Sequence, residues 1–155
     1  MNLRIVALGT RLPAWIAAGY AEYARRLPRG FALELRELKS EPRDRGRTTR
    51  QILAAEAARI DAATAGFHVV ALDEHGEHWS TAALGKKLAG WRDRAVPVAF
   101  VIGSADGLDP RIKRDAGAVV ALSALTLPHG LARVLLAEQI YRAASLLSGH
   151  PYHRE

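Results

Sequence analysis

Ala118-Val-Val-Ala-Leu-Ser-Ala-Leu-Thr-Leu-Pro-His129 is an apolar run that ends in a proline and a histidine. Its valine-rich first part, residues 118–122, predicts a buried strand, and residues 131–147 carry apolar side chains nearly all round a helix. Such a helix needs burial on more than one side. A chain of 155 residues covers it only in part, so we expect its second apolar face to form a homodimer interface.

The segment after this helix, Pro151-Tyr-His-Arg-Glu155, crowds an aromatic ring, an imidazole, a guanidinium and a carboxylate into five positions. Chain ends usually fray, and a frayed end has no need of all these side chains. We therefore predict that residues 151–155 are a functional tail. Tyr152 suits stacking on an extruded base, Arg154 suits pairing with a phosphate or a base anion, and His153 titrates near neutral pH.

Towards the N-terminus, strand patterns alternate with helix patterns. Alternating or valine-rich segments predict strands at residues 3–8, 31–38, 68–72 and 96–102. Apolar residues at helical spacing predict helices at residues 13–26 and 49–65, and Ser80 fits the N-cap of a further helix. This alternation predicts a single doubly wound α/β domain over residues 1–155, a parallel sheet with flanking helices.

Composition narrows the class of protein. Lysine and arginine number 22 against 16 aspartate and glutamate, and this excess favours a polyanionic partner, although a merely basic protein has the same balance. The absence of cysteine excludes disulfides and a thiolate nucleophile. The start lacks a signal-peptide core, and no apolar run approaches the ~20 residues that span a bilayer. We expect a cytoplasmic protein without a membrane partner.

Residues 39–50 form the one linker-like stretch, Lys39-Ser-Glu-Pro-Arg-Asp-Arg-Gly-Arg-Thr-Thr-Arg50. Five basic residues outnumber Glu41 and Asp44 there, which predicts a mobile basic loop. Two interpretations stay open for it. One is a solvated connection, and the other is a contact with RNA phosphates that would weaken as salt is added.

Three local patterns also leave alternatives open. Gly103-Ser-Ala-Asp-Gly107 follows a buried strand, where α/β proteins bind ligands, but it matches no phosphate-loop or dinucleotide motif and also suits a plain turn. His129 begins the last helix, as an anion site or merely as a cap. His75 and His78 have acidic neighbours that suit zinc, yet a solvated loop around Gly76 is the simpler interpretation, and we predict no metal.

An ordered set of motifs spread over the whole chain resembles one known family. The motifs are Leu3-Arg-Ile-Val-Ala-Leu-Gly-Thr10, Val70-Ala-Leu-Asp73, Phe100-Val-Ile-Gly103, Leu125-Thr-Leu-Pro-His129, Arg133, Glu138, Tyr141-Arg-Ala143 and Pro151-Tyr-His-Arg-Glu155. In this order and spacing they are similar to the ribosomal RNA large subunit methyltransferase H family, of the SPOUT class. No single motif would suffice, but the ordered set is specific.

The resemblance implies an α/β-knotted fold with the deep trefoil knot of SPOUT methyltransferases, and a homodimer. It implies methylation of N3 of pseudouridine 1915 in 23S rRNA within the assembled ribosome, with S-adenosyl-L-methionine as cofactor. By the same resemblance, the cofactor contacts are Leu72, Gly103, Leu122, Ser123, Ala124, Leu125, Thr126 and Leu127.

The predicted catalytic residues are His129, Tyr152, His153 and Arg154. We expect Arg154 to stabilise the anion of the base, and His153, with His129, to orient the base or accept its proton. The tail that carries three of these residues is expected to complete the site of the partner subunit.

One loop departs from the family pattern. Ser104 stands where the family usually has glycine, and Asp106 where it often has glutamate. The serine either crowds the cofactor or replaces a backbone contact. A lost cofactor site would leave a non-catalytic ribosome-binding protein with the same fold. A small α/β hydrolase is a more distant alternative, because no serine lies in a G-x-S-x-G frame.

Overall fold

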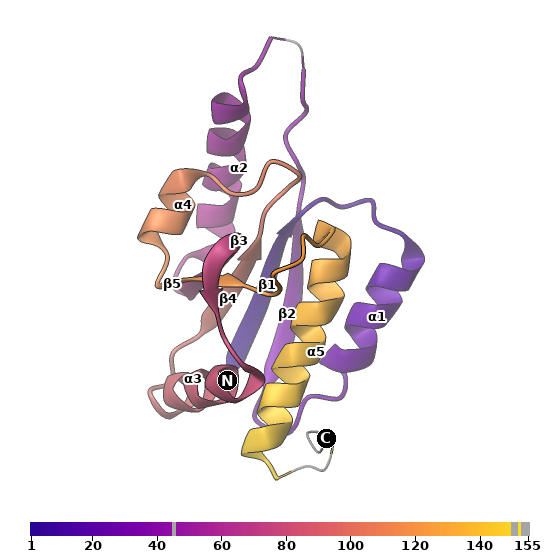
Figure 1. Cartoon of the computed structure of the whole chain (residues 1–155), viewed down its shortest axis with the longest axis vertical. Coiled ribbons are helices and arrows are strands. Elements are labelled where there is room, and N and C mark those ends of the chain that lie inside the picture. The colour runs from indigo at the N-terminus through magenta and orange to yellow at the C-terminus, as the bar shows by residue number, and fades with distance from the viewer. Residues whose placement is uncertain (45, 150–151, 153–155) are drawn as a thin grey trace.

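The computed structural model describes residues 1–44, 46–149 and 152 of the chain. Strands and helices alternate through this part of the molecule (Figure 1). In chain order they are β1 (Asn2–Leu8), α1 (Ala14–Ala24), β2 (Ala32–Leu38), α2 (Thr49–Thr64), β3 (His68–His78), α3 (Thr81–Asp93), β4 (Val98–Ile102), α4 (Pro110–Asp115), β5 (Ala118–Ala121) and α5 (His129–Leu147). The predicted α/β alternation is confirmed, and the short helix α4 is an addition to it.

The five strands form one parallel sheet in the order β2-β1-β4-β3-β5. In its centre, Leu3 of β1 pairs with Leu33 of β2 on one side and Val98 of β4 on the other. All five residues of β4 are buried, as expected for a strand covered on both faces. The parallel sheet predicted from the valine-rich segments is therefore confirmed, whereas the deep trefoil knot stays a prediction.

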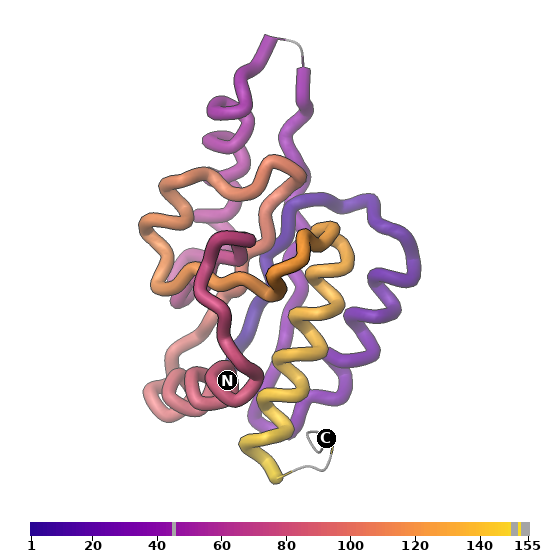
Figure 2. Tube along the Cα trace, viewed as in Figure 1, coloured from indigo at the N-terminus to yellow at the C-terminus, as the bar shows by residue number. Residues whose placement is uncertain are grey.

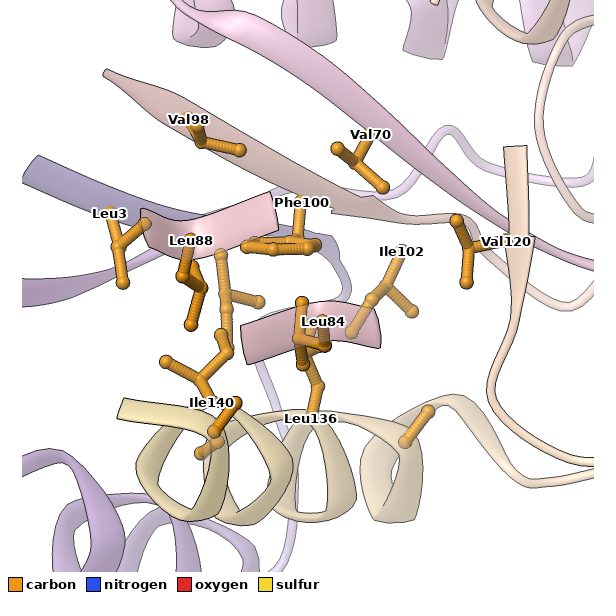
Figure 3. Close-up of a cluster of buried hydrophobic side chains, with 14 of the residues drawn as sticks. Leu3, Val70, Leu84, Leu88, Val98, Phe100, Ile102, Val120, Leu136 and Ile140 are labelled. Carbon is orange, nitrogen blue, oxygen red and sulfur yellow. The ribbon is translucent and has the colours of Figure 1, made fainter. Parts of the chain in front are cut away.

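Two apolar layers cover the sheet. On one face, Leu84 and Leu88 of α3 and Leu136 and Ile140 of α5 pack against strand residues such as Phe100 (Figure 3). On the other face, α2 and α4 contribute the buried residues Ala57, Ile60, Ala63 and Ile112. The inner strands β1, β4 and β3 therefore contribute buried residues to both layers, which accounts for their short continuous apolar runs, whereas the edge strand β2 has no buried residue.

The last helix, α5, is flanked within the same chain by α1 and α3. A small residue permits the approach of α1, because a Cβ at Gly19 would lie 3.1 Å from Cγ1 of Val134. Leu136 and Ile140 are fully buried, while Leu131 and Leu135 remain only half-buried. The chain thus covers most of this helix by itself, and the predicted homodimer interface stays a prediction.

The end of β3 corrects the prediction of a solvated loop around Gly76. The strand continues to His78, and after a bulge its Glu77 pairs with Val120 of β5, to which Leu72 also pairs. A Cβ at Gly76 would lie 2.6 Å from the backbone nitrogen and carbon of Val120. Glycine is required here because the two backbones touch, and that need is invisible in the local pattern of polar residues.

The segment between β2 and α2 extends with the start of α2 away from the rest of the molecule, at the top of the view in Figure 2. Helix α2 begins with a capping box, in which Thr48 accepts from the Gln51 amide and the Gln51 side chain accepts from the Thr48 amide. In the described part of the chain, no helix is long and apolar enough to cross a membrane.

Candidate functional site

A cleft of about 500 Å³ opens where β4 and β5 end, beside the bulged middle part of β3. Helix α3 follows β3 on one face and α4 follows β4 on the other, so the cleft lies at a topological switch point, where α/β proteins bind ligands. Its volume suits a small-molecule cofactor. The predicted contacts that line it are Leu72, Gly103, Leu122, Ser123, Leu125, Thr126 and Leu127.

The structure therefore brings together residues that are far apart in the sequence, together with His129 at the start of α5. Ala124 is the exception, because it is exposed and does not line the cleft. Leu125 lines the cleft but is also 76% exposed, an unusual state for a leucine. The wall made by residues 122–127 is thus open to a ligand or to a further macromolecular surface.

A tight turn after β4 forms the opposite wall of the cleft. The Gly107 amide donates to the Ser104 carbonyl at 2.9 Å, and Gly107 has a left-handed φ of +80°. A Cβ at Gly103 would lie 2.5 Å from the carbonyl carbon and oxygen of Gly107, so no larger residue fits. Residues 103–107 thus form a tight turn that lines the cleft, and ligand binding by this loop stays a prediction.

Ser104 does not turn its side chain into the cleft. Its hydroxyl donates to Glu56 at 2.8 Å and accepts from the Arg43 guanidinium at 3.0 Å, and the residue is buried. Glu56 is itself only 2% exposed and also accepts from the Glu41 amide at 3.0 Å. The departure from the family pattern is thus tied to a buried carboxylate on α2.

The sequence prediction missed Glu56, although a signal was present. Ile52, Leu53, Ala57 and Ile60 form the buried stripe of α2, and Glu56 lies on the same stripe. A carboxylate on an apolar helix face needs a partner, because a buried charge without hydrogen bonds is costly. The pattern therefore indicates a buried polar contact but does not identify Ser104, which is 48 residues away.

The basic segment 39–50 is held to the body by ion pairs. Glu41 pairs with both Arg47 and Arg59, and hydrogen bonding by Arg47 is the main cause of the lowered pKa of Glu41. Arg43 pairs with Asp106 at 2.9 Å. The segment is therefore more than the solvated connection considered from the sequence, and its contact with RNA stays a prediction.

A second ion pair lies in the cleft wall. Asp73, at the bend of β3, accepts from Lys113 of α4 at 2.9 Å and from the His75 amide at 2.9 Å. Burial alone would raise the pKa of Asp73, but these hydrogen bonds and charges hold it below its ordinary value. The cleft thus combines apolar walls with one polar corner.

His129 begins α5 and faces the cleft. Burial, followed by the positive charges of Arg133 and Arg43, lowers its pKa below the ordinary value of 6.5. The imidazole is therefore uncharged at neutral pH and can accept a proton or a hydrogen bond. The position of His129 does not require the bound anion that the sequence left open, and an uncharged imidazole suits a general base.

Arg133, one turn further along α5, fixes this helix to the sheet. Its guanidinium is 1% exposed and pairs with Glu37 at 2.6 Å, and it donates to the carbonyls of Leu8 at 3.0 Å and Gly9 at 2.7 Å. Its Nε has no hydrogen-bond partner among the described residues. The family motif that includes Arg133 therefore has a structural role at the ends of β1 and β2.

Within the tail, Tyr152 packs on the far half of α5. Its ring lies 4.4 Å from that of Tyr141, its hydroxyl donates to Glu138 at 3.2 Å, and the Arg142 guanidinium lies 4.9 Å from its centroid. Burial, then the charge of Glu138, raises the pKa of Tyr152. Glu138 also pairs with Arg142, four residues later on α5, at 2.8 Å.

The structure does not bring Tyr152 to the cleft of its own chain. Tyr141, on which it packs, is 12 residues after His129, which corresponds to about 18 Å along a helix. His153 and Arg154, the other predicted catalytic residues of the tail, lie outside the described residues. The cleft and Tyr152 thus lie towards opposite ends of α5.

Metal binding at the end of β3 has no support in the geometry of the described chain. Asp73 is engaged by Lys113, and Glu77 accepts from the Trp79 indole at 2.9 Å. No group of three histidine, aspartate or glutamate side chains that could hold a metal ion occurs in residues 1–44, 46–149 and 152.

Comparisons with known proteins agree over nearly the whole chain. Residues 1–153 match the family model "Predicted SPOUT methyltransferase". The chain is 52% identical to "Ribosomal RNA large subunit methyltransferase H" of Nitrosospira multiformis and 53% identical to that of Ralstonia nicotianae, each over 99% of both chains. Among solved structures, a probable methyltransferase of Bordetella pertussis has a similar fold, with a TM-score of 0.58 and 18% identity over 92% of this chain and 96% of that one.

Proposed function

Because the chain belongs to the ribosomal RNA large subunit methyltransferase H family, within the SPOUT methyltransferases, we propose that it methylates N3 of pseudouridine 1915 in 23S rRNA. The methyl donor is S-adenosyl-L-methionine, and the substrate is the assembled ribosome in the cytoplasm. The resemblance carried by the sequence motifs is confirmed at the level of the family. The observation that carries the finer proposal is the cleft at the ends of β4 and β5, beside the bulged part of β3.

The residues of the cleft fit this cofactor. Leu72, Leu122 and Leu127 provide apolar walls for an adenine ring, and the backbone of residues 122–127 offers donors and acceptors. At Gly103 the backbone itself forms the wall, since a side chain there would collide with Gly107. The pair of Asp73 and Lys113 supplies charges of both signs near the polar parts of such a molecule.

When bound, the cofactor would supply a methyl group on a sulfonium, and in-line attack by a nitrogen would break the S–C bond and release a neutral thioether, without a metal. The N3 proton must leave as the new N–C bond forms, so the protein has to hold the base in line and take this proton. His129 is uncharged at neutral pH and faces the cleft, which suits it to accept the proton or to orient the base. Arg154 stabilises the anion of the base, and His153, together with His129, orients the base or accepts its proton.

The tail serves the cleft of the partner subunit in a homodimer. Tyr152 supports this arrangement, because it packs beside Tyr141 and Glu138, about 18 Å along α5 from His129 of its own chain. A second subunit whose α5 runs in the opposite direction brings its tail to this cleft. Tyr152 then exchanges its contact with Tyr141 for stacking on the extruded base.

The test is incubation of the protein with radiolabelled S-adenosyl-L-methionine and ribosomes from a strain that lacks this methylation. Assembled ribosomes and isolated subunits are compared, and the labelled nucleotide is mapped. We expect label on one pseudouridine, strongest on assembled ribosomes. Ribosome binding without any label would instead support a non-catalytic ribosome-binding protein.

A further inference from the structure

Ser104 is the residue at which the cofactor loop, residues 103–107, is tied to two other parts of the chain. Its hydroxyl donates a hydrogen bond to Glu56 of α2 at 2.8 Å, and it accepts one from Arg43 of the basic segment at 3.0 Å. Both donor and acceptor capacities of the hydroxyl are therefore used by charged groups, which form stronger hydrogen bonds than neutral ones.

The ties continue on both sides of Ser104. Glu56 also accepts from the Glu41 amide at 3.0 Å, so one buried carboxylate holds the cofactor loop and the start of the basic segment together. Arg43 also donates from Nε to Asp106 at 2.9 Å, two residues further along the same loop. The loop is thus held at two points by Arg43 and at one by Glu56.

All five residues of this loop line the cleft, whereas Glu56 does not. Gly103 and Gly107 have no side chain to fix the loop against the body, and the backbone hydrogen bond from the Gly107 amide to the Ser104 carbonyl lies within the turn itself. A hydroxyl that is directed into the protein can supply the missing anchor without occupying any of the space in the cleft.

We propose that Ser104 is a positioning residue, which, held by Glu56 and Arg43, fixes the cofactor loop in its binding conformation. This inference rests on the proposed function, because it gives the loop a role in holding S-adenosyl-L-methionine. The serine in place of a family glycine then strengthens the site rather than marking its loss. It also joins the basic segment to the cofactor loop, through the hydrogen bond from Arg43.

The first test compares Ser104→Ala with Ser80→Ala as a matched control. Ser80 caps α3 by accepting from the Ala83 amide and does not line the cleft, so its loss removes one hydroxyl contact outside the loop. Hydrogen exchange of the backbone amides is measured without ligand. We expect faster exchange at residues 103–107 in Ser104→Ala and only in α3 for the control, and equal exchange of the loop in all three proteins would overturn the proposal.

The second test measures S-adenosyl-L-methionine binding by calorimetry, without RNA. We expect Ser104→Ala to bind about tenfold more weakly than wild type, and the control to bind as wild type does. Wild-type affinity in Ser104→Ala would overturn the inference. A wild-type protein without cofactor affinity would contradict the proposed function alone, because hydrogen exchange still decides whether Ser104 fixes the loop.

A double-mutant cycle separates a linked pair from two independent contacts. Glu56→Gln keeps the shape of the side chain but removes its charge, and it is combined with Ser104→Ala. If the two residues act through one hydrogen bond, the double variant loses little more affinity than Ser104→Ala alone. Additive losses would show that Glu56 does not act through Ser104.

Discussion

The uncharged imidazole of His129 makes the stability of the protein depend on pH in a defined direction. Its pKa in the folded chain is lowered by burial and by Arg133 and Arg43, from an ordinary value of 6.5. As the pH falls below this value, His129 takes up a proton in the unfolded chain before it does so in the folded chain. The contribution of His129 to stability is therefore complete above pH 6.5 and is lost as the pH falls through the lowered pKa. His129→Asn should therefore lose less stability than wild type when the pH is lowered from above 6.5 to below it.

The measurement is urea unfolding at about pH 7.5 and about pH 5.5, on either side of the ordinary imidazole value. His75→Asn serves as the control, because the His75 side chain is 85% exposed. We expect this control to keep the wild-type loss of stability on acidification. The same loss in His129→Asn as in wild type would contradict the assignment of His129.

Arg133 tests how strongly α5 is fixed to the sheet. Arg133→Met removes the donors to the carbonyls of Leu8 and Gly9 and the pair with Glu37, but keeps most of the buried stem. We expect a loss of about 2 kcal/mol in the free energy of unfolding, because two carbonyls lose a charged donor. Arg29→Met, at an exposed position, should change it by less than about 0.5 kcal/mol.

The most informative difference between sequence and structure at the residue scale concerns Glu56 and Ser104. The sequence shows both residues but not their contact. The position of Glu56 on an apolar stripe already indicates a buried polar partner. The partner itself depends on how α2 lies against the end of β4, which is tertiary information. Local patterns therefore predict that such a contact is needed but not with which residue it is made.

At the scale of elements, periodicity predicted eight of the ten helices and strands of the described chain, and the N-cap Ser80 indicated a ninth, α3. The long outer part of β3 is the main difference, because its polar residues suggest a loop. Pairing with β5 after a bulge provides the hydrogen bonds that keep it extended. Such pairing depends on a strand that lies more than 40 residues later, and a local pattern cannot contain it.

Gly76 permits that pairing, and its substitution tests it. A Cβ there would lie 2.6 Å from the Val120 backbone, so Gly76→Ala should separate the two strands and cost about 2 kcal/mol of the free energy of unfolding. It should also weaken cofactor binding, since β5 leads into residues 122–127 of the cleft. Both effects are measured by urea unfolding and by calorimetry.

Gly46→Ala is the matched control, because a Cβ at that position meets nothing within 4 Å. We expect it to unfold at nearly the wild-type urea concentration and to bind the cofactor normally. Equal behaviour of the two alanine variants would show that β3 and β5 do not need close contact at Gly76.

At the scale of the whole molecule, the cleft and Tyr152 lie towards opposite ends of α5. The sequence predicted both groups of residues, but only the fold shows that one chain does not bring Tyr152 to its own cleft. In the proposed arrangement, a complete site combines the cleft of one chain with the tail of the other. Sedimentation should accordingly show a dimer at micromolar concentration, and a monomer would contradict the arrangement.

Mixed dimers give the sharper prediction. A variant that lacks residues 152–155 keeps its cleft, and Gly103→Ala keeps its tail but has a Cβ 2.5 Å from the Gly107 backbone. Each should be inactive in methyl transfer to ribosomes when assayed alone. After unfolding and refolding together, half of the dimers are mixed and each mixed dimer has one complete site, so about a quarter of wild-type activity should return.

Mixing the two variants without refolding serves as the control, because stable dimers exchange subunits slowly and activity should return only with time. Full activity of the truncated variant alone would show that the tail takes no part in catalysis. If both variants are inactive and the refolded mixture stays inactive, although mixed dimers are detected by mass, each tail must serve its own cleft. Tyr152 would then have to leave Tyr141 and Glu138 and travel along α5 within one chain.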